Sequence, residues 1–244
     1  MNNTNSDIYE MLDTLSLPVA AQRFSELTQS QELVNYTAFQ FIREVLEPQY
    51  TETLNRRFET NLRLSSLINK GALTENLKTG NGRVYNDATV QQVLGFHFAE
   101  NRQNVGIYGV TGAGKSYLSN ALCVAAIRQF KTVKYIRANT MMSEMDQARI
   151  KGTYLEYVNH MARLDLLVID DFGLMDLDLD KCRDFFEVID SRDSQKSTII
   201  VSQLPVKSWY DLFADNTYAD ACLDRMVHKA FRLELNGKNM RNPV

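Results

Sequence analysis

The sequence predicts an α/β fold in which a five-stranded parallel sheet, covered by helices on both faces, follows a small all-helical domain. Three observations lead to this prediction. From about residue 89 onward, short apolar segments alternate with longer segments of helical periodicity, which is typical of a parallel sheet. Residues 1–80 show apolar side chains at helical spacing but no convincing strand. A glycine-rich motif also lies between the first expected strand and the helix after it.

The N-terminal domain is expected to span residues 1–80 and to contain about four helices. Its apolar side chains recur at helical spacing in three groups: Ile8, Met11, Leu12, Leu15 and Leu17; Phe39, Ile42, Val45 and Leu46; and Leu54, Phe58, Leu62 and Leu64. Pro18 and Pro48 are expected to separate helices. The arginine-rich stretch 51–67 fits either a solvated helix face or a DNA contact. Polar, glycine-containing residues then predict a linker over 81–88.

The second domain is expected over residues 89–244. Five strands are predicted there, over 105–109, 132–137, 165–170, 197–202 and 230–235. Helices are predicted between them, over 115–129, 140–163 with a break near Gly152, 179–193, and 206–227 with a break near Asn216. Parallel strands need crossover connections, so this alternation predicts helices on both faces of the sheet. Trp209 is expected to pack at a helix start rather than to bind a ligand.

The first strand leads into Gly109-Val110-Thr111-Gly112-Ala113-Gly114-Lys115-Ser116, which fits the phosphate-binding motif G-x-x-x-x-G-K-[S/T]. Its glycines allow a tight turn whose backbone N–H groups can surround a phosphate. Lys115 is expected to contact the β- and γ-phosphates, and the Ser116 hydroxyl to ligate Mg²⁺. The loop, together with Tyr117 in the helix that follows, therefore predicts a nucleoside triphosphate site.

A second motif is Leu164-Asp165-Leu166-Leu167-Val168-Ile169-Asp170-Asp171. Its four consecutive apolar residues predict a central strand that is buried on both faces. Ligands of such sheets bind outside the carboxyl ends of the strands. Asp170 is therefore expected to hold Mg²⁺, directly or through water, and Asp171 to position and polarise an attacking water. Many related ATPases have glutamate in place of Asp171, a difference that bears on hydrolysis rather than on nucleotide binding.

Two further positions are candidates for the same site. Gln203, at the end of the strand over 197–202, can hydrogen-bond a γ-phosphate or the attacking water, or can cap loop N–H groups. Arg225, after the last long helix, can stabilise the charge that develops on a transferring phosphoryl group in a neighbouring subunit, or can form an ordinary ion pair. Arg192 and Arg241 are additional candidates for an arginine of this kind.

Composition narrows the class of protein. The formal net charge is −3 and gives no global signal for nucleic acid, but residues 165–193 are acidic whereas 55–83 and 225–244 are basic. The three cysteines are far apart, so neither a zinc site nor a disulfide framework is indicated, and buried thiols are expected. The sequence has no signal-peptide pattern and no run of 18 apolar residues. We therefore expect a cytoplasmic protein that does not interact with membranes.

Several segments resemble IstB, the transposition helper ATPase of insertion sequences. They are the phosphate loop, Asp165-Leu-Leu-Val-Ile-Asp-Asp-Phe-Gly173, Val201-Ser-Gln-Leu-Pro205, Leu223-Asp-Arg-Met-Val-His228, Leu233-Glu-Leu-Asn-Gly-Lys-Asn-Met-Arg241 and the N-terminal Leu12-Asp-Thr-Leu-Ser-Leu-Pro-Val-Ala-Ala-Gln-Arg-Phe24. The resemblance covers nearly the whole chain, and the Ser-Gln-Leu-Pro and Leu-Asp-Arg segments are its most specific part. IstB is similar to the DnaC helicase loaders within the AAA+ superfamily.

The resemblance implies an AAA+ fold that lacks a C-terminal helical lid. It implies that Lys115, Ser116 and Asp170 bind ATP and Mg²⁺, that Asp171 is the catalytic acid, that Gln203 is at the sensor position and that Arg225 matches the arginine finger. It also implies a homo-oligomer on duplex DNA, as a ring, spiral or filament, and an IstA-like transposase as partner. ATP hydrolysis would then disassemble the filament or stimulate the transposase.

Alternatives remain open at this point. The same motor could belong to a helicase loader of the DnaC type, with a different protein partner. A small-molecule kinase could use the same phosphate loop but would need an acceptor pocket, and a nucleotide-dependent clamp would turn over little ATP. Gly237-Lys238-Asn239 replaces the Gly-Glu-Ser that is usual at the end of the family, and this difference concerns the role of Arg241 as a terminal sensor.

Overall fold

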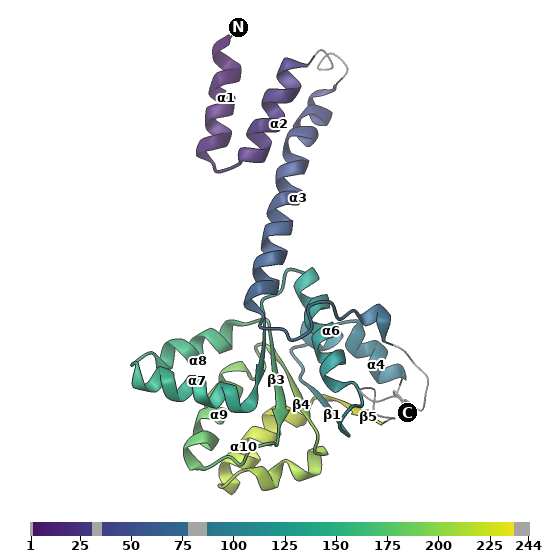
Figure 1. Ribbon diagram of the computed structural model, residues 1–244, viewed down its shortest axis with the longest axis vertical. Coiled ribbons are helices and arrows are strands. Elements are labelled where there is room, and N and C mark those ends of the chain that lie inside the picture. Colours follow the sequence, from purple (N-terminus) through teal and green to yellow (C-terminus); the bar gives the residue numbers. More distant parts are fainter. Residues whose placement is uncertain (1, 31–35, 78–86, 237–244) are drawn as a thin grey trace. The chain divides into compact units, whose positions relative to one another are not determined.

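The computed structural model describes residues 2–30, 36–77 and 87–236 (Figure 1). Contacts within the chain divide it into two compact units, Met1–Thr60 and Asn61–Val244. This division lies earlier in the chain than the boundary expected near residue 80. Most of the expected linker over 81–88 lies outside the described residues.

The first unit contains helices α1 (Asn2–Thr14) and α2 (Pro18–Gln29) and the first part of α3 (Ala38–Leu64). Its small core consists of Ala20, Phe24 and Leu27 from α2 and Val45 from α3, all buried. The ring of Phe24 meets that of Phe41 edge to face, with 5.9 Å between the ring centres. Pro18 begins α2, as expected, because its fixed φ suits the first turn of a helix.

Pro48 was expected to end a helix, and this prediction is wrong, since it lies inside α3. An interior proline removes a backbone hydrogen bond, which costs about 3 kcal/mol. The next residue, Gln49, is buried, and its Oε1 accepts hydrogen bonds from the backbone N–H groups of Val19 (3.0 Å) and Ala20 (3.3 Å). These donors belong to the first turn of α2, whose N-cap has no side-chain hydrogen bond. This contact between helices favours a continuous α3 despite the proline.

The second unit is built on a sheet of five parallel strands in the order β2-β3-β4-β1-β5. The strands are β1 (Val105–Gly109), β2 (Val133–Arg137), β3 (Leu166–Phe172), β4 (Ser197–Ser202) and β5 (Phe231–Leu235). Each lies where the sequence predicted one, with shifts of one or two residues at the ends. The β4 side chains are buried throughout, whereas the edge strand β5 alternates. In this order β1 has β4 and β5 as its neighbours, so the carboxyl ends of β1, β3 and β4 are adjacent.

Helices cover both faces of the sheet (Figure 1). The α-helices of this unit are α4 (Asp87–Leu94), α5 (His97–Glu100), α6 (Lys115–Arg128), α7 (Ala138–Ile150), α8 (Tyr154–Arg163), α9 (Leu179–Arg192) and α10 (Asn216–Val227). Short 3-10 helices occupy Thr74–Asn76, Val206–Ser208 and Tyr210–Leu212. The last two replace the first part of the helix that was expected over 206–227. The expected break near Gly152 separates α7 from α8.

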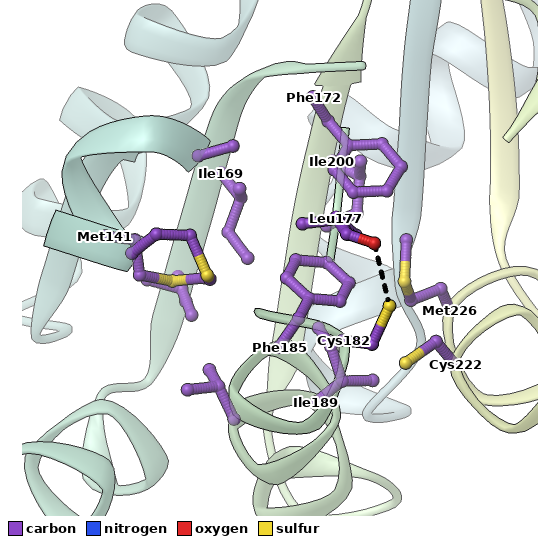
Figure 2. Packing of buried hydrophobic residues seen from close by; sticks show 14 of the residues in the cluster. Met141, Ile169, Phe172, Leu177, Cys182, Phe185, Ile189, Ile200, Cys222 and Met226 are labelled. Carbon is purple, nitrogen blue, oxygen red and sulfur yellow. Dashed lines mark hydrogen bonds between the residues drawn. The ribbon is translucent and has the colours of Figure 1, made fainter. Parts of the chain in front are cut away.

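The main core lies between the sheet and helices α7 to α10, and Figure 2 shows its packing. The ring of Phe172 stacks on that of Phe185 and meets Trp209 edge to face, with ring centres 5.2 Å apart in both pairs. Trp209 is buried at the start of a 3-10 helix, which confirms its expected packing role. Cys123, Cys182 and Cys222 are buried free thiols, also as expected, and Cys182 donates to the carbonyl oxygen of Leu177 (Figure 2).

Arg192 is a structural residue of this core and not a candidate for nucleotide contact. Its side chain lies in the interior, with 1% of the residue exposed. The guanidinium donates to the carbonyl oxygens of Met161, Leu164 and Ser197 and to the hydroxyl of Thr198. Burial lowers the pKa of Arg192 to about 9. These contacts tie the end of α9 to the start of β4, so the side chain cannot reach a ligand.

Candidate functional site

The phosphate loop connects the carboxyl end of β1 to the amino end of α6. Gly109 has φ of +142°, and a Cβ there would lie 2.1 Å from the carbonyl oxygen of Leu235 in β5. Gly114, the residue before α6, has φ of +95°, in the left-handed region that favours glycine. The turn therefore depends on glycine both for its close approach to β5 and for the entry into the helix. It directs the amino end of α6, which favours anions, toward the site.

Lys115 lies within the loop rather than in solvent. Its ammonium group donates to the carbonyl oxygens of Gly109 (2.7 Å) and Val110 (2.9 Å), and the residue is buried. A positive charge and a set of backbone donors thus lie around one concave turn. This combination fits the phosphates of a nucleotide.

Ser116 and Asp170 meet as the sequence predicted. The Ser116 hydroxyl donates to Oδ2 of Asp170 at 3.2 Å, and the Asp171 backbone N–H donates to Oδ1 of Asp170 at 2.7 Å. Asp170 is buried, with 4% of the residue exposed. Hydroxyl and carboxylate oxygens are the ligands that Mg²⁺ prefers, and Mg²⁺ is usually held by one or two carboxylates together with phosphates and water. No group of three or more His, Cys, Asp or Glu side chains suited to a metal occurs in residues 2–30, 36–77 and 87–236. The residues present therefore fit Mg²⁺ bound together with a nucleotide.

Asp171 occupies an irregular point in β3. Its φ is +57°, and the pairing of β3 with β4 shifts register between Ile169 and Phe172. The bulge turns the partly exposed Asp171 side chain toward Arg137, at the end of β2, with 3.3 Å between Nε and Oδ2. Asp170 and Asp171 thus differ in environment, because one is buried beside Ser116 and the other lies at the mouth of the site beside a cation.

Gln203 lies at the same mouth, directly after β4. Its Oε1 accepts a hydrogen bond of 2.7 Å from the Thr111 hydroxyl in the phosphate loop. The side chain amide is therefore held over the loop rather than turned back on the strand. Thr111 engages the amide oxygen of Gln203. A primary amide can donate through its NH₂ group while its oxygen accepts, so the NH₂ group can still donate to a ligand.

A pocket of about 440 Å³ joins these residues. It is lined by Ile68, Asn69, Thr111, Gly112, Gly114, Lys115, Ser116, Tyr117, Asn120, Arg137, Asp170, Asp171, Ser202 and Gln203. Of these, Ile68, Asn69, Asn120, Arg137 and Ser202 were not predicted. The Asn69 N–H donates to Oδ1 of Asn120 at 2.9 Å, which holds the segment before the sheet beside the first turns of α6. The sequence did not predict that this segment lines the site, because the contact joins residues 51 positions apart and no motif includes it.

Arg225 is not among the residues that line this pocket. It lies near the last turn of α10, and its backbone carbonyl accepts from the side chain of Asn104, just before β1 begins. Its guanidinium contacts Asp190 at 2.8 Å, the carbonyl oxygen of Ala221 at 3.0 Å and the ring face of Phe186. Arg225 is thus at the amino end of β1, whereas the phosphate loop is at the carboxyl end. It lines a separate pocket of about 400 Å³. Arg241 lies outside the described residues.

Comparison with known proteins identifies the family of the chain. The sequence matches the family described as IstB-like ATP binding protein over residues 10–243. The chain belongs to this family. It is 32% identical to the insertion sequence ATP-binding protein y4pL of Sinorhizobium fredii over 232 residues, which cover 95% of this chain and 94% of that protein. It is therefore an ATP-binding protein of the kind found in insertion sequences.

Solved structures support the IstB-like protein's AAA+ fold. One is the replication initiator DnaA bound to AMPPCP and single-stranded DNA, with a TM-score of 0.56 and 22% identity over 71% of this chain and 53% of that chain. Another is the DnaC helicase loader, with a TM-score of 0.51 and 18% identity over 61% of this chain and 86% of that chain. At these identities the likeness concerns the fold. Among the described helices, none is long and apolar enough to cross a membrane.

Proposed function

We propose that this IstB-like protein hydrolyses ATP with Mg²⁺, assembles on duplex DNA and assists the transposase of its insertion sequence. The observation that carries the proposal is the meeting of Asp171 and Gln203 with the Ser116–Asp170 pair at one pocket beside the phosphate loop. A site that only binds nucleotide needs the loop and the metal ligands. Asp171 and Gln203 add a carboxylate and an amide at the mouth, which are the groups needed to orient and deprotonate water.

Each residue then has a defined task. Lys115 contacts the β- and γ-phosphates, while Ser116 and Asp170 hold Mg²⁺, which when bound neutralises charge on the phosphates. Asp171 accepts a proton from the attacking water, and Gln203 orients that water or the γ-phosphate. Arg225 lies at the opposite end of β1 from the phosphate loop of its own chain, so in this proposal it acts as an arginine finger for the next subunit. Turnover therefore requires an oligomer.

The comparisons guide the choice of partners. Relatives that align over nearly the whole chain are named as insertion sequence proteins, which favours a transposase of the IstA type as partner. The fold likeness to a DnaA bound to single-stranded DNA and to a helicase loader is compatible with action on DNA. The basic residues at 55–83 and 225–244 supply positive charge for phosphate contacts. Duplex DNA is the form that we propose.

A helicase loader of the DnaC type is the second candidate, and the fold likeness to that loader is the observation that favours it. Family membership and the insertion sequence relatives favour the transposase. The two are separated by presenting the protein, with ATP, to an IstA-like transposase and to a replicative helicase. Binding to the helicase alone would support the loader.

Electron microscopy with duplex DNA tests the assembly. We expect rings, spirals or filaments with ATP and their loss with ADP. Lys115→Ala should abolish both ATP binding and assembly, whereas Lys207→Ala, which removes an exposed lysine from a 3-10 helix, should change neither. DNA affinity should fall steeply with salt, because phosphate contacts release counterions. DNA-bound oligomers of Lys115→Ala would contradict an ATP-dependent switch, and ADP formation that requires a small-molecule acceptor would indicate a kinase.

A further inference from the structure

Tyr135 is a buried tyrosine whose hydroxyl lies at the carboxylate expected to hold the metal. It belongs to β2, where it is paired with Val168 of β3, and 2% of the residue is exposed. Its hydroxyl donates a hydrogen bond to Oδ2 of Asp170, the same oxygen that accepts from Ser116. The sequence contained no sign of this contact, since β2 carries no nucleotide-binding motif.

A buried tyrosine needs a hydrogen-bond acceptor, so the contact alone does not establish a role. The half-buried Tyr157 shows the ordinary case, because its hydroxyl donates to Glu144 at 3.0 Å, between α8 and α7 and outside the pocket. Tyr135 differs in its acceptor. With it, Asp170 is held from three elements: by the backbone N–H of Asp171 in β3, by Ser116 in α6 and by Tyr135 in β2.

The kind of donor also matters. Asp170 is buried, and the three donors named above, two hydroxyls and a backbone N–H, are all uncharged. A lysine or arginine at the place of Tyr135 would satisfy the carboxylate but would also cancel its charge. A neutral hydroxyl satisfies one lone pair and leaves the negative charge for a cation.

We propose that Tyr135 is a positioning residue for Mg²⁺: its hydroxyl fixes the carboxylate of Asp170 in the orientation that the metal requires. The inference rests on the proposed function, in which Asp170 and Ser116 hold Mg²⁺ with the nucleotide. Mg²⁺ tolerates little departure from octahedral geometry. Mutating a residue that hydrogen-bonds a metal-ligating side chain typically lowers metal affinity by about 10- to 100-fold. Ser116 itself binds the metal in this proposal, whereas Tyr135 acts on the metal only through the carboxylate of Asp170.

Tyr135→Phe removes the hydroxyl and keeps the ring, and Tyr157→Phe is the matched control. The full-length protein with ADP is titrated with Mn²⁺, which reports on the metal site by electron paramagnetic resonance. We expect Tyr135→Phe to weaken Mn²⁺ binding by about ten-fold. Affinity for a fluorescent ATP analogue in EDTA, without metal, should stay within about two-fold of wild type, since the phosphate loop is unchanged. Tyr157→Phe should alter neither quantity.

Equal Mn²⁺ affinities for the two variants and the wild type would overturn the role of Tyr135. Circular dichroism checks that Tyr135→Phe is folded at the assay temperature. If it is not, Tyr135→Met, which also lacks the hydroxyl but fills an irregular space, takes its place with the same expected loss. Failure of the proposed function looks different. In that case the wild type would not bind nucleotide, or Lys115→Ala would bind it equally well, whatever the result for Tyr135.

Discussion

At the scale of single residues, Gly109 shows how closely the phosphate loop depends on the sheet beside it. A Cβ at Gly109 would overlap the carbonyl oxygen of Leu235, whereas one at Gly114 would meet no atom within 4 Å. Both have positive φ, so both alanine variants carry backbone strain of about 1–3 kcal/mol. Gly109→Ala must in addition displace β5, and we expect it to lower the unfolding temperature more than Gly114→Ala. Thermal unfolding of the two variants measures this, and equal unfolding temperatures would contradict the steric argument.

Arg137 is a second case, because its partner Asp171 is the proposed proton acceptor. Both side chains are partly exposed, so the pair contributes little to stability, about 0–1 kcal/mol. Its loss would instead remove one of the contacts that orient the Asp171 carboxylate. We expect Arg137→Ala to lower kcat for ATP hydrolysis on the order of ten-fold, since small misplacements of a reacting group are costly. The unfolding temperature should be unchanged.

Arg128→Ala is the control for Arg137, as it removes an exposed arginine paired with Glu75 outside the pocket. A loss of kcat shared by both variants would argue against a specific role for Arg137.

The residues of the site differ in how far the sequence alone could predict them. Lys115, Ser116 and Asp170 could be placed because phosphate and Mg²⁺ chemistry requires a fixed motif. Arg137 could not, because its contact depends on a bulge that only the paired strands create.

At the scale of elements, α3 offers a test of how tertiary contacts override a local signal. Replacing Pro48 by alanine restores an interior N–H donor and removes a ring that crowds the preceding turn. We expect a net gain of about 2 kcal/mol, because the helix gain of about 3 kcal/mol exceeds the entropy lost from the unfolded state. Pro18→Ala, at the first position of α2, removes no such defect and should be neutral or slightly destabilising. Urea unfolding compares them, and a Pro48→Ala variant that is less stable than wild type would contradict this account.

The strands were predictable because buried parallel strands are short apolar runs that end in polar residues, as in β3 and β4. The expectation failed where structure depends on distant contacts. The helix expected over 206–227 begins as two 3-10 helices, between which Trp209 is buried and donates to the carbonyl oxygen of Leu204. Helical periodicity alone could not distinguish these short turns from an α-helix, since both place apolar residues three or four positions apart.

At the scale of the whole molecule, the boundary between the units follows contacts rather than composition. Residues 61–77 belong with the sheet, because the carbonyl of Ser65 accepts from the N–H of Tyr135 and the N–H of Asn69 donates to Asn120. The polar residues near 80 suggested a later boundary. Local composition marks where a chain lacks apolar residues, but it cannot show which side of a boundary a segment packs against. Residues 68 and 69, which line the nucleotide pocket, lie in the part of this segment that packs with the sheet.

The proposed oligomer leads to a prediction that depends on contacts between subunits. Arg225→Ala should bind ATP normally and lose hydrolysis, and Asp171→Ala should do the same, because each removes one half of a site shared between subunits. Mixing the two inactive variants should restore some ATPase activity, since some interfaces then combine an intact Asp171 with an intact Arg225. Arg183→Ala, which removes an exposed arginine paired with Asp180 on α9, is the control and should stay active by itself. Absence of rescue at every mixing ratio would place Arg225 outside the catalytic site. Activity restored only together with DNA-bound oligomers would tie hydrolysis to assembly.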